Sequence, residues 1–228
     1  MRVLVAIPWR SQPHRVAAYT DTVQRYHDLL PDPDILDFDT GHEPFGLAAS
    51  RNTGVRAAEQ LDADIVVLAD ADTLPEREPL LAAIDAALDD GLVHLPYTEY
   101  RSLRQAGTDQ FRAGVDLDYC ASLVVDGACS GCYVTTPATW WAHGGQDERF
   151  LGWGGEDAAW YAAHTTLLGA EPVRHDGCVY SLHHEASPKD GEQYSANFSL
   201  VYRYHQAQGD EAAMRALIAE SAAETATV

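Results

Sequence analysis

The first ninety residues alternate short apolar runs with longer amphipathic segments. The apolar runs predict strands at Val3–Ile7, Ile35–Phe38 and Ile65–Ala69, and the first and third are apolar throughout, as in strands buried on both faces. Apolar spacings of three and four residues predict helices at His14–Leu30, Leu47–Leu61 and Glu78–Leu88. This βαβαβα order predicts a parallel sheet covered by helices on both faces.

Ligands of such sheets bind at the carboxyl ends of the strands. We therefore expect Pro8 to Arg10, Asp37 to Asp39 and Asp70 to Asp72 to meet along one edge.

The sequence of the second half of the chain predicts shorter strands and helices. Strands are expected at Leu92–Tyr97, Tyr119–Val125, Gly131–Thr135, Val173–Arg174 and Cys178–Leu182, and the polar stretch Glu99–Asp118 is expected to be a loop. Helices are expected at Ala158–Leu168, Tyr194–Ala207 and Glu211–Glu224, with a short one ending over Trp140–Gly145 and frayed residues at Ala222–Val228.

Length and composition indicate a single folded α/β domain. The chain has 228 residues, of which 46% are hydrophobic and 22% charged. The 35 acidic residues against 15 basic ones give a net charge of -20, which disfavours nucleic acid as a partner. No apolar run approaches the ~20 residues that span a bilayer, and no signal-peptide pattern follows Met1, so we expect a cytoplasmic protein.

Four cysteines are too few for a disulfide scaffold. The C-x-x-C of Cys129 and Cys132 has no second pair to complete a zinc site, so buried free thiols are expected in preference to a redox or metal role.

The sequence Asp70-Ala71-Asp72 follows a strand predicted to be buried. Two carboxylates one residue apart at a strand end can hold a divalent cation, which in turn binds a diphosphate. The alternative is an acidic turn that begins a helix near Thr73.

The segment Leu151-Gly-Trp-Gly-Gly-Glu-Asp157 combines a glycine-rich backbone, one large aromatic ring and two carboxylates at a helix start. Trp153 can stack on the apolar face of a sugar, and an adjacent carboxylate can take a proton from a hydroxyl. The alternative is that Trp153 fills the core while Glu156 and Asp157 complement the helix dipole. The double glycine, costly in conformational entropy, favours the functional interpretation.

The pair His183-His184 follows the last predicted strand. Histidine together with carboxylates suits Mn²⁺ better than Mg²⁺, whose ligands are nearly all oxygen. An ordinary pair of partly exposed histidines is the alternative.

Together these motifs resemble the GT-A glycosyltransferases, close to family 2, with a C-terminal segment similar to that of the β-1,4-galactosyltransferases and polypeptide N-acetylgalactosaminyltransferases. Three segments carry the resemblance: Ala49-Ser-Arg-Asn-Thr-Gly54, Leu68-Ala-Asp-Ala-Asp-Thr-Leu-Pro75, and Cys129-Ser-Gly-Cys-Tyr-Val134 through Gly152-Trp-Gly-Gly-Glu-Asp157. The resemblance implies one GT-A domain, with a nucleotide-sugar half at 1–98, an acceptor half at 99–190 and C-terminal helices at 191–228.

The resemblance also implies roles. Mn²⁺, or Mg²⁺, would be held by Asp72 and His184, with Asp70 nearby and His183 as the alternative ligand, because Ser181 replaces the family's methionine. The nucleotide sugar would be bound by Pro8, Arg10, Asp37, Asp39, Arg51, Asn52, Asp70, Ala71 and Asp72. The acceptor would be bound by Trp153, Gly154, Gly155 and Glu156, with Asp157 as the catalytic base.

The function implied is metal-dependent transfer of a sugar from a nucleotide sugar, with a UDP-sugar favoured, to an acceptor hydroxyl. The aspartate at position 157 implies transfer with inversion at the anomeric carbon, since retaining relatives typically end the W-G-G-E-D motif in asparagine. A nucleotidyltransferase would need a glycine-rich phosphate loop, which Pro8-Trp-Arg-Ser11 is not, and a carbohydrate-binding module would need neither metal nor base. The acceptor could be a saccharide, a lipid-linked sugar, a protein or a metabolite, and a modified phage DNA base is disfavoured by the charge.

Overall fold

The computed structural model describes residues 1–185 and 189–225, and its first half follows the predicted βαβαβα order. The three strands β1, β2 and β3 are parallel to one another. The elements are β1 (Val3–Pro8), α1 (Val16–Leu29), β2 (Asp34–Phe38), α2 (Leu47–Gln60), β3 (Ile65–Ala69) and α3 (Arg77–Ala86). All five residues of β3 are fully buried, as its apolar sequence predicts.

The central sheet is completed by three strands from the second half, in the order β2-β1-β3-β8-β5-β9. The strands are β8 (Cys132–Thr135), β5 (His94–Leu95) and β9 (Val173–Arg174). β8 runs antiparallel to both β3 and β5, whereas the other three pairings are parallel. The sheet is therefore mixed but mostly parallel. The strand predicted at Leu92–Tyr97 is reduced to the two residues of β5.

A second sheet has the order β4-β10-β6-β7. It consists of β4 (Thr73–Pro75), β10 (Cys178–Ser181), β6 (Glu99–Ser102) and β7 (Leu123–Val124). The alternative of a helix that starts near Thr73 is therefore wrong, because β4 pairs with β10.

The prediction of a loop at Glu99–Asp118 was also wrong. This stretch contains β6, α4 (Arg104–Arg112) and the start of a 3₁₀ turn at Leu117–Tyr119. β6 is held between β10 and β7, which are distant in sequence. α4 is a polar helix that buries only Gly107 and Thr108. Because it has no apolar face, its sequence did not predict a helix.

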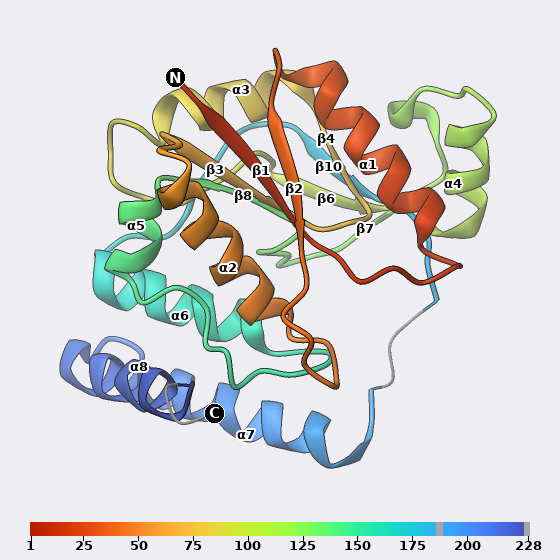
Figure 1. Cartoon of the computed structure of the whole chain (residues 1–228). Helices are drawn as coiled ribbons and strands as arrows, with labels where there is room; N and C mark the ends of the chain where they lie inside the picture. Colours follow the sequence, from red (N-terminus) through yellow and green to blue (C-terminus); the bar gives the residue numbers. More distant parts are fainter. Residues whose placement is uncertain (186–188, 226–228) are drawn as a thin grey trace.

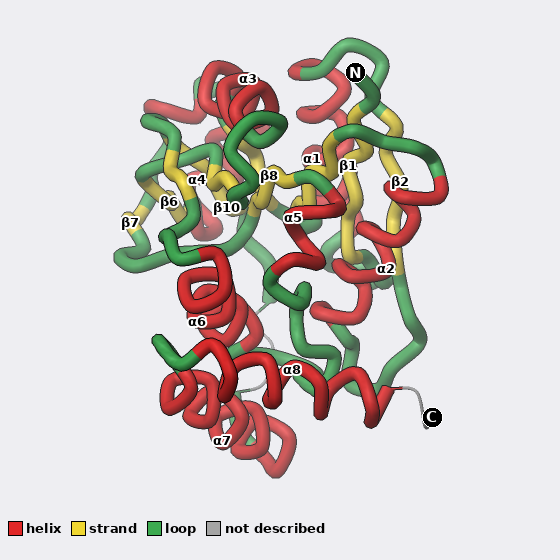
Figure 2. The backbone as a smooth tube through the Cα atoms, turned by 90° about the vertical axis from the view of Figure 1, so that its left-hand side faces the viewer, coloured by secondary structure: helices red, strands yellow, loops and turns green. Residues whose placement is uncertain are grey.

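The helices lie on both sides of the central sheet. α1 and α3 lie on one side, and α2, α5 (Pro137–Ala142) and α6 (Glu156–Leu168) lie on the other (Figure 1). α7 (Gly191–Ala207) and α8 (Glu211–Thr225) pack on α6 and form an outer layer beyond it (Figure 2). The cysteines are all free, and three of the four are buried, as predicted.

Candidate active site

The carboxyl ends of β1, β2 and β3 lie at one edge of the sheet, and an ion pair joins the first two. Arg10, just after β1, donates from Nε to Oδ2 of Asp39 at 2.7 Å and from Nη2 to Oδ1 at 2.8 Å. The Arg10 guanidinium lowers the pKa of Asp39, and it also donates to Glu43. Pro8 is buried at the end of β1, and Asp37 is exposed. Arg10 is thus fixed beside Asp39 at the rim of the sheet.

A buried arginine on α2 joins two of the predicted site carboxylates. The side chain of Arg51 is only 1% exposed, and it donates from Nη2 to Oδ1 of Asp70 at 2.6 Å and from Nη1 to Oδ1 of Asp157 at 2.7 Å. Its Cζ lies 5.0 Å from the centroid of the Tyr133 ring. Burial lowers the pKa of a guanidinium, but the charge of Asp70 and its neighbours outweighs burial and raises the pKa of Arg51. Arg51 is a permanent positive charge at the centre of the site.

Asp157 is anchored through one carboxylate oxygen. Its Oδ1 accepts hydrogen bonds from Arg51, from the Tyr133 hydroxyl and, at 3.4 Å, from Nε2 of Gln146. Its Oδ2 accepts no hydrogen bond from the part of the chain that the structure describes, and the side chain is 24% exposed. Asp157 is therefore a carboxylate with a fixed orientation and one oxygen able to accept a proton.

The preceding carboxyl group, Glu156, has a different electrostatic environment. Glu156 is 8% exposed, and burial together with the charge of Asp157 raises its pKa to about 8. At neutral pH Glu156 is therefore mostly protonated and can donate a hydrogen bond.

The segment Asp70-Ala71-Asp72 links β3 to β4 and directs its two carboxylates to different partners. Asp70 faces Arg51, whereas Oδ2 of Asp72 lies 3.0 Å from Nε2 of His184. Ala71 is buried between them. Burial raises the pKa of Asp70 despite Arg51, and Asp157 and Asp72 add to the effect. Asp70, Asp72 and Asp157 thus lie close enough to repel one another, and a divalent cation would offset that repulsion.

Of the two consecutive histidines, His184 makes the contact with Asp72. Its Nδ1 lies 2.7 Å from the carbonyl oxygen of Glu185, and because a carbonyl can only accept, Nδ1 carries a proton. The hydrogen bond to Asp72 raises the pKa of His184. His183 is exposed, and its backbone N–H donates to Oγ1 of Thr108.

The pair of Asp72 and His184 fits a metal site with two protein ligands. A neutral imidazole whose Nδ1–H is held by a carbonyl presents Nε2 as the ligand atom, and here that atom lies beside a carboxylate oxygen. Within residues 1–185 and 189–225, no group of three or more His, Cys, Asp or Glu residues is arranged to hold a metal. The remaining ligands of a bound metal would have to come from a substrate and from water.

The aromatic ring of the glycine-rich segment is at the surface. Trp153 is 42% exposed, so the alternative that it fills the core is wrong. The ammonium group of Lys189 lies 3.9 Å from its ring centroid, and the ring of Tyr194 is stacked with it at 6.0 Å. A sugar that stacks on the face covered by Lys189 has to displace that ammonium group.

The glycines around Trp153 are required by the backbone. Gly154 and Gly155 have φ values of 101° and 102°, in the region that side chains with a Cβ disfavour. A Cβ on Gly155 would also lie 2.5 Å from Cγ2 of Val201 on α7. The double glycine therefore turns the chain sharply into α6 and permits close packing on α7.

Asn52, predicted to bind the nucleotide sugar, is instead used inside the protein. Its Nδ2 donates to the carbonyl of Gln146 at 2.7 Å and to Oε1 of Glu148 at 2.9 Å, and its Oδ1 accepts from Nε1 of Trp140 and the backbone N–H of Gln146. The side chain is 3% exposed, so a buried amide that has all these partners has no group left for a ligand. Asn52 fixes the backbone at Gln146, which in turn contacts Asp157.

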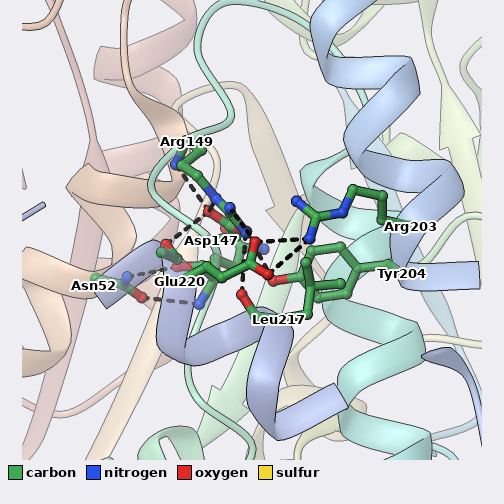
Figure 3. Close-up of polar contacts among 9 residues, drawn as sticks. Asn52, Asp147, Arg149, Arg203, Tyr204, Leu217 and Glu220 are labelled. Carbon is green, nitrogen blue, oxygen red and sulfur yellow. Dashed lines mark hydrogen bonds and ion pairs between the residues drawn. The ribbon is translucent and has the colours of Figure 1, made fainter. Parts of the chain in front are cut away.

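The segment that follows Gln146 is anchored to the C-terminal helices (Figure 3). Asp147, whose side chain is 1% exposed, accepts hydrogen bonds from Arg149, from the Tyr204 hydroxyl on α7 and from the Ser221 hydroxyl on α8. Arg149 and Arg203 both pair with Glu220, and Arg149 also donates to the carbonyl of Leu217. The outer helices therefore support the loop that positions Gln146.

Three residues near the site were not predicted from the sequence. Tyr133 and Gln146 hydrogen-bond Asp157, but an inward-facing tyrosine on a strand and a loop glutamine have no local signature. Arg15 is near enough to His184 for its charge to lower the pKa of that imidazole. It lies in the loop after β1, where a ligand-binding arginine could have been expected.

No protein-family model and no curated protein sequence matches this chain, but solved structures do. The structure of GalNAc-T7 with UDP, GalNAc and Mn²⁺ superposes with a TM-score of 0.59 at 12% identity, covering 88% of this chain and 47% of that one. This chain has the GT-A fold.

Two further GT-A structures are less similar. The mannosyltransferase PcManGT from Pyrobaculum calidifontis, with GDP-Man and Mn²⁺, gives a TM-score of 0.47 at 18% identity, covering 94% of this chain and 64% of that one. The catalytic domain of Drosophila β1,4-galactosyltransferase 7 with xylobiose gives 0.46 at 14% identity, covering 76% and 64%. The GT-A domain described here therefore spans less than two thirds of each of these chains. None of its described helices is both long and apolar enough to cross a membrane.

Proposed function

We propose that this protein is a metal-dependent glycosyltransferase that moves a sugar from a nucleoside-diphosphate sugar, UDP-linked in the simplest case, to an acceptor hydroxyl. One observation carries the proposal: Arg51 joins Asp70 and Asp157 at the sheet edge, and Asp72 beside Asp70 pairs with His184. The GT-A fold supports it, since GalNAc-T7 was solved with UDP, a sugar and Mn²⁺.

The donor is proposed to bind over the carboxyl ends of β1, β2 and β3, in the half formed by residues 1–98. Asp72 and His184 would hold Mn²⁺, or Mg²⁺, and the bound ion would neutralise the charge that develops on the departing diphosphate. Arg51 keeps Asp70 oriented beside this pair. Pro8, Arg10, Asp37 and Asp39 form the rim on which the nucleobase and ribose would lie.

Asp157 is proposed to be the general base of an inverting, single displacement. Its Oδ2 takes the proton of the acceptor hydroxyl while the acceptor oxygen forms a bond to the anomeric carbon. The bond between the anomeric carbon and the diphosphate oxygen breaks, and its electron pair leaves with the diphosphate. Arg51, Tyr133 and Gln146 hold Oδ1, so the carboxylate needs no reorientation.

The acceptor is proposed to bind over the loop that leads into α6. Glu156, protonated at neutral pH, would donate a hydrogen bond to an acceptor oxygen, and Trp153 with Gly154 and Gly155 would form the platform under its sugar ring.

Calorimetry with UDP, in Mn²⁺ and in EDTA, tests the donor part of this proposal. We expect UDP to bind only with the metal, and His184→Ala to weaken the binding more than His183→Ala, which serves as the matched control. Equal UDP affinity in EDTA would contradict the proposal. Release of pyrophosphate from a nucleoside triphosphate and a sugar phosphate would indicate a nucleotidyltransferase, and sugar binding without nucleotide or metal binding would indicate a carbohydrate-binding module.

A further inference from the structure

A row of exposed aromatic rings begins at the candidate active site and continues along α7. Trp153 is 42% exposed, Phe198 54% and Tyr202 64%. The rings of Trp153 and Tyr194 are stacked with their centroids 6.0 Å apart, and the rings of Tyr194 and Phe198 follow at 4.8 Å. We call Trp153, Tyr194, Phe198 and Tyr202 the aromatic row.

The geometry of the helix extends this row along α7. Tyr194, Phe198 and Tyr202 are spaced by four residues and therefore share one side of α7, over about 12 Å of its axis. The helix lies at the outer edge of the molecule, beyond α6 (Figures 1 and 2). With Trp153 added, the row is several times longer than a single sugar ring.

The row is held in place relative to the catalytic loop. Asn197, on the buried side of α7, donates from Nδ2 to the carbonyl of Leu151 at 2.9 Å and to that of Trp153 at 3.3 Å. Val201 on the same helix packs where Gly155 has no side chain. The start of the row and the loop before Asp157 therefore form one unit.

The chemistry of the row is unusual for this chain. The protein has a net charge of -20, yet the ten residues from Gln193 to Tyr202 include no charged side chain. The exposed residues between the rings, Ser195 and Ser199, are also neutral, and their hydroxyl groups donate to backbone carbonyls of α7. The aromatic faces of Phe198 and Tyr202 suit a ligand that is itself uncharged, with apolar faces and hydroxyl edges. On Trp153 such a ligand displaces the ammonium group of Lys189.

We propose that the aromatic row binds a neutral glycan chain, so that the acceptor is an oligosaccharide or polysaccharide whose units beyond the reacting sugar stack along α7. This inference rests on the proposed function, because it extends the acceptor site over Trp153. Each further sugar adds contact with another ring, and the affinity increases with chain length until the row is covered.

Affinity measurements with neutral oligosaccharides test this. The probes are disaccharides and hexasaccharides from xylan, cellulose, mannan, chitin and starch, without donor. The disaccharide and hexasaccharide from one polysaccharide form a series. In at least one of the five series we expect the hexasaccharide to bind the native protein about tenfold more tightly than the disaccharide. The double variant Phe198→Ala/Tyr202→Ala is expected to lose that gain. Tyr119→Ala, which removes an 81% exposed tyrosine far along the chain from α7, is the matched control and keeps the gain.

Thermal melts accompany the measurement, so that a loss of folding in the double variant is not taken for a loss of binding. If the double variant is unfolded, Phe198→Leu and Tyr202→Leu, which keep apolar bulk but remove the flat ring, replace it. Absence of length dependence in every series overturns the inference, as does a gain that the folded variants retain. Self-association or binding to neutral lipid vesicles that disappears in the same variants also overturns it, by assigning the row to a protein or membrane contact. UDP binding with Mn²⁺ is independent of these outcomes, so failure here is distinguishable from failure of the proposed function.

Discussion

Replacing Arg51 by methionine removes the positive charge that joins Asp70 and Asp157 while keeping an unbranched chain of similar length. The two carboxylates are then left facing each other across the site without their common partner. Because removing one member of a buried ion pair leaves uncompensated charge, the cost exceeds that of losing a surface pair.

The size of this effect follows from the exposure of the three side chains. Breaking a buried ion pair typically costs about 3–5 kcal/mol. Arg51 is 1% exposed, but Asp70 and Asp157 are each 24% exposed, so water reaches both carboxylates and reduces the penalty. We therefore expect a loss of about 3 kcal/mol in the free energy of unfolding, or about 6–12 °C in melting temperature for a chain of this size.

Urea denaturation at pH 7 in EDTA measures this loss. The matched control is Arg56→Met on the same helix, where a half-exposed arginine pairs with Glu148 at 2.9 Å, and its expected cost is below about 1 kcal/mol. Adding Asp70→Asn to Arg51→Met should recover part of the stability, because one of the uncompensated charges is removed. Equal unfolding midpoints for Arg51→Met and Arg56→Met would refute the reasoning.

Three other outcomes are expected. Asp157→Asn keeps the Oδ1 acceptor but removes the basicity, so kcat should decrease about 10²–10⁴-fold while the UDP affinity stays unchanged. An unaltered kcat would exclude the role of Asp157 as the base. Trp153→Ala should change the melting temperature by less than about 2 °C, because the ring is exposed, and a large decrease would mean that it belongs to the core. Burial lowers the pKa of His143 to about 3 and that of His164 to about 4, below the ordinary value of about 6.5. The unfolded chain therefore takes up protons first at these two positions, whereas Glu156, with a pKa of about 8 in the folded chain, takes up its proton first there and opposes them. In the variant Glu156→Gln, which removes the opposing group, the free energy of unfolding should decrease as the pH falls below about 6.5, by up to about 1.4 kcal/mol per pH unit for each imidazole. A free energy of unfolding that stays constant from pH 7 to 5.5 in this variant would contradict the reasoning.

The sequence predicts the parallel half of the fold because that half is specified locally. β3 has the predicted bounds, Ile65–Ala69, since a strand buried on both faces must be apolar throughout. β6 could not be predicted, because Glu99–Ser102 is a polar segment that is a strand only through its pairing with β10 and β7. Pairing between segments distant in sequence leaves no local periodicity to detect.

For the candidate site, the sequence indicates which residues carry chemistry but not their partners. The resemblance singled out Arg51, Asp70 and Asp157, yet Arg51 and Asp157 are 106 positions apart, and nothing in either segment predicts the ion pair. Asn52 illustrates the limit of transferring a motif by position. On α2 the residue next to Arg51 points to another side of the helix, where it bonds Gln146.

The central claim, metal-dependent sugar transfer at Asp72, His184 and Asp157, is tested most directly by a screen of nucleotide sugars for slow hydrolysis, since many transferases pass their donor to water. The account predicts release of nucleoside diphosphate from at least one donor in Mn²⁺, with none in EDTA. It also predicts that His184→Ala abolishes the release and that His183→Ala retains it. Release that persists undiminished in EDTA or in His184→Ala, or no release from any donor with or without an acceptor glycan, would contradict it.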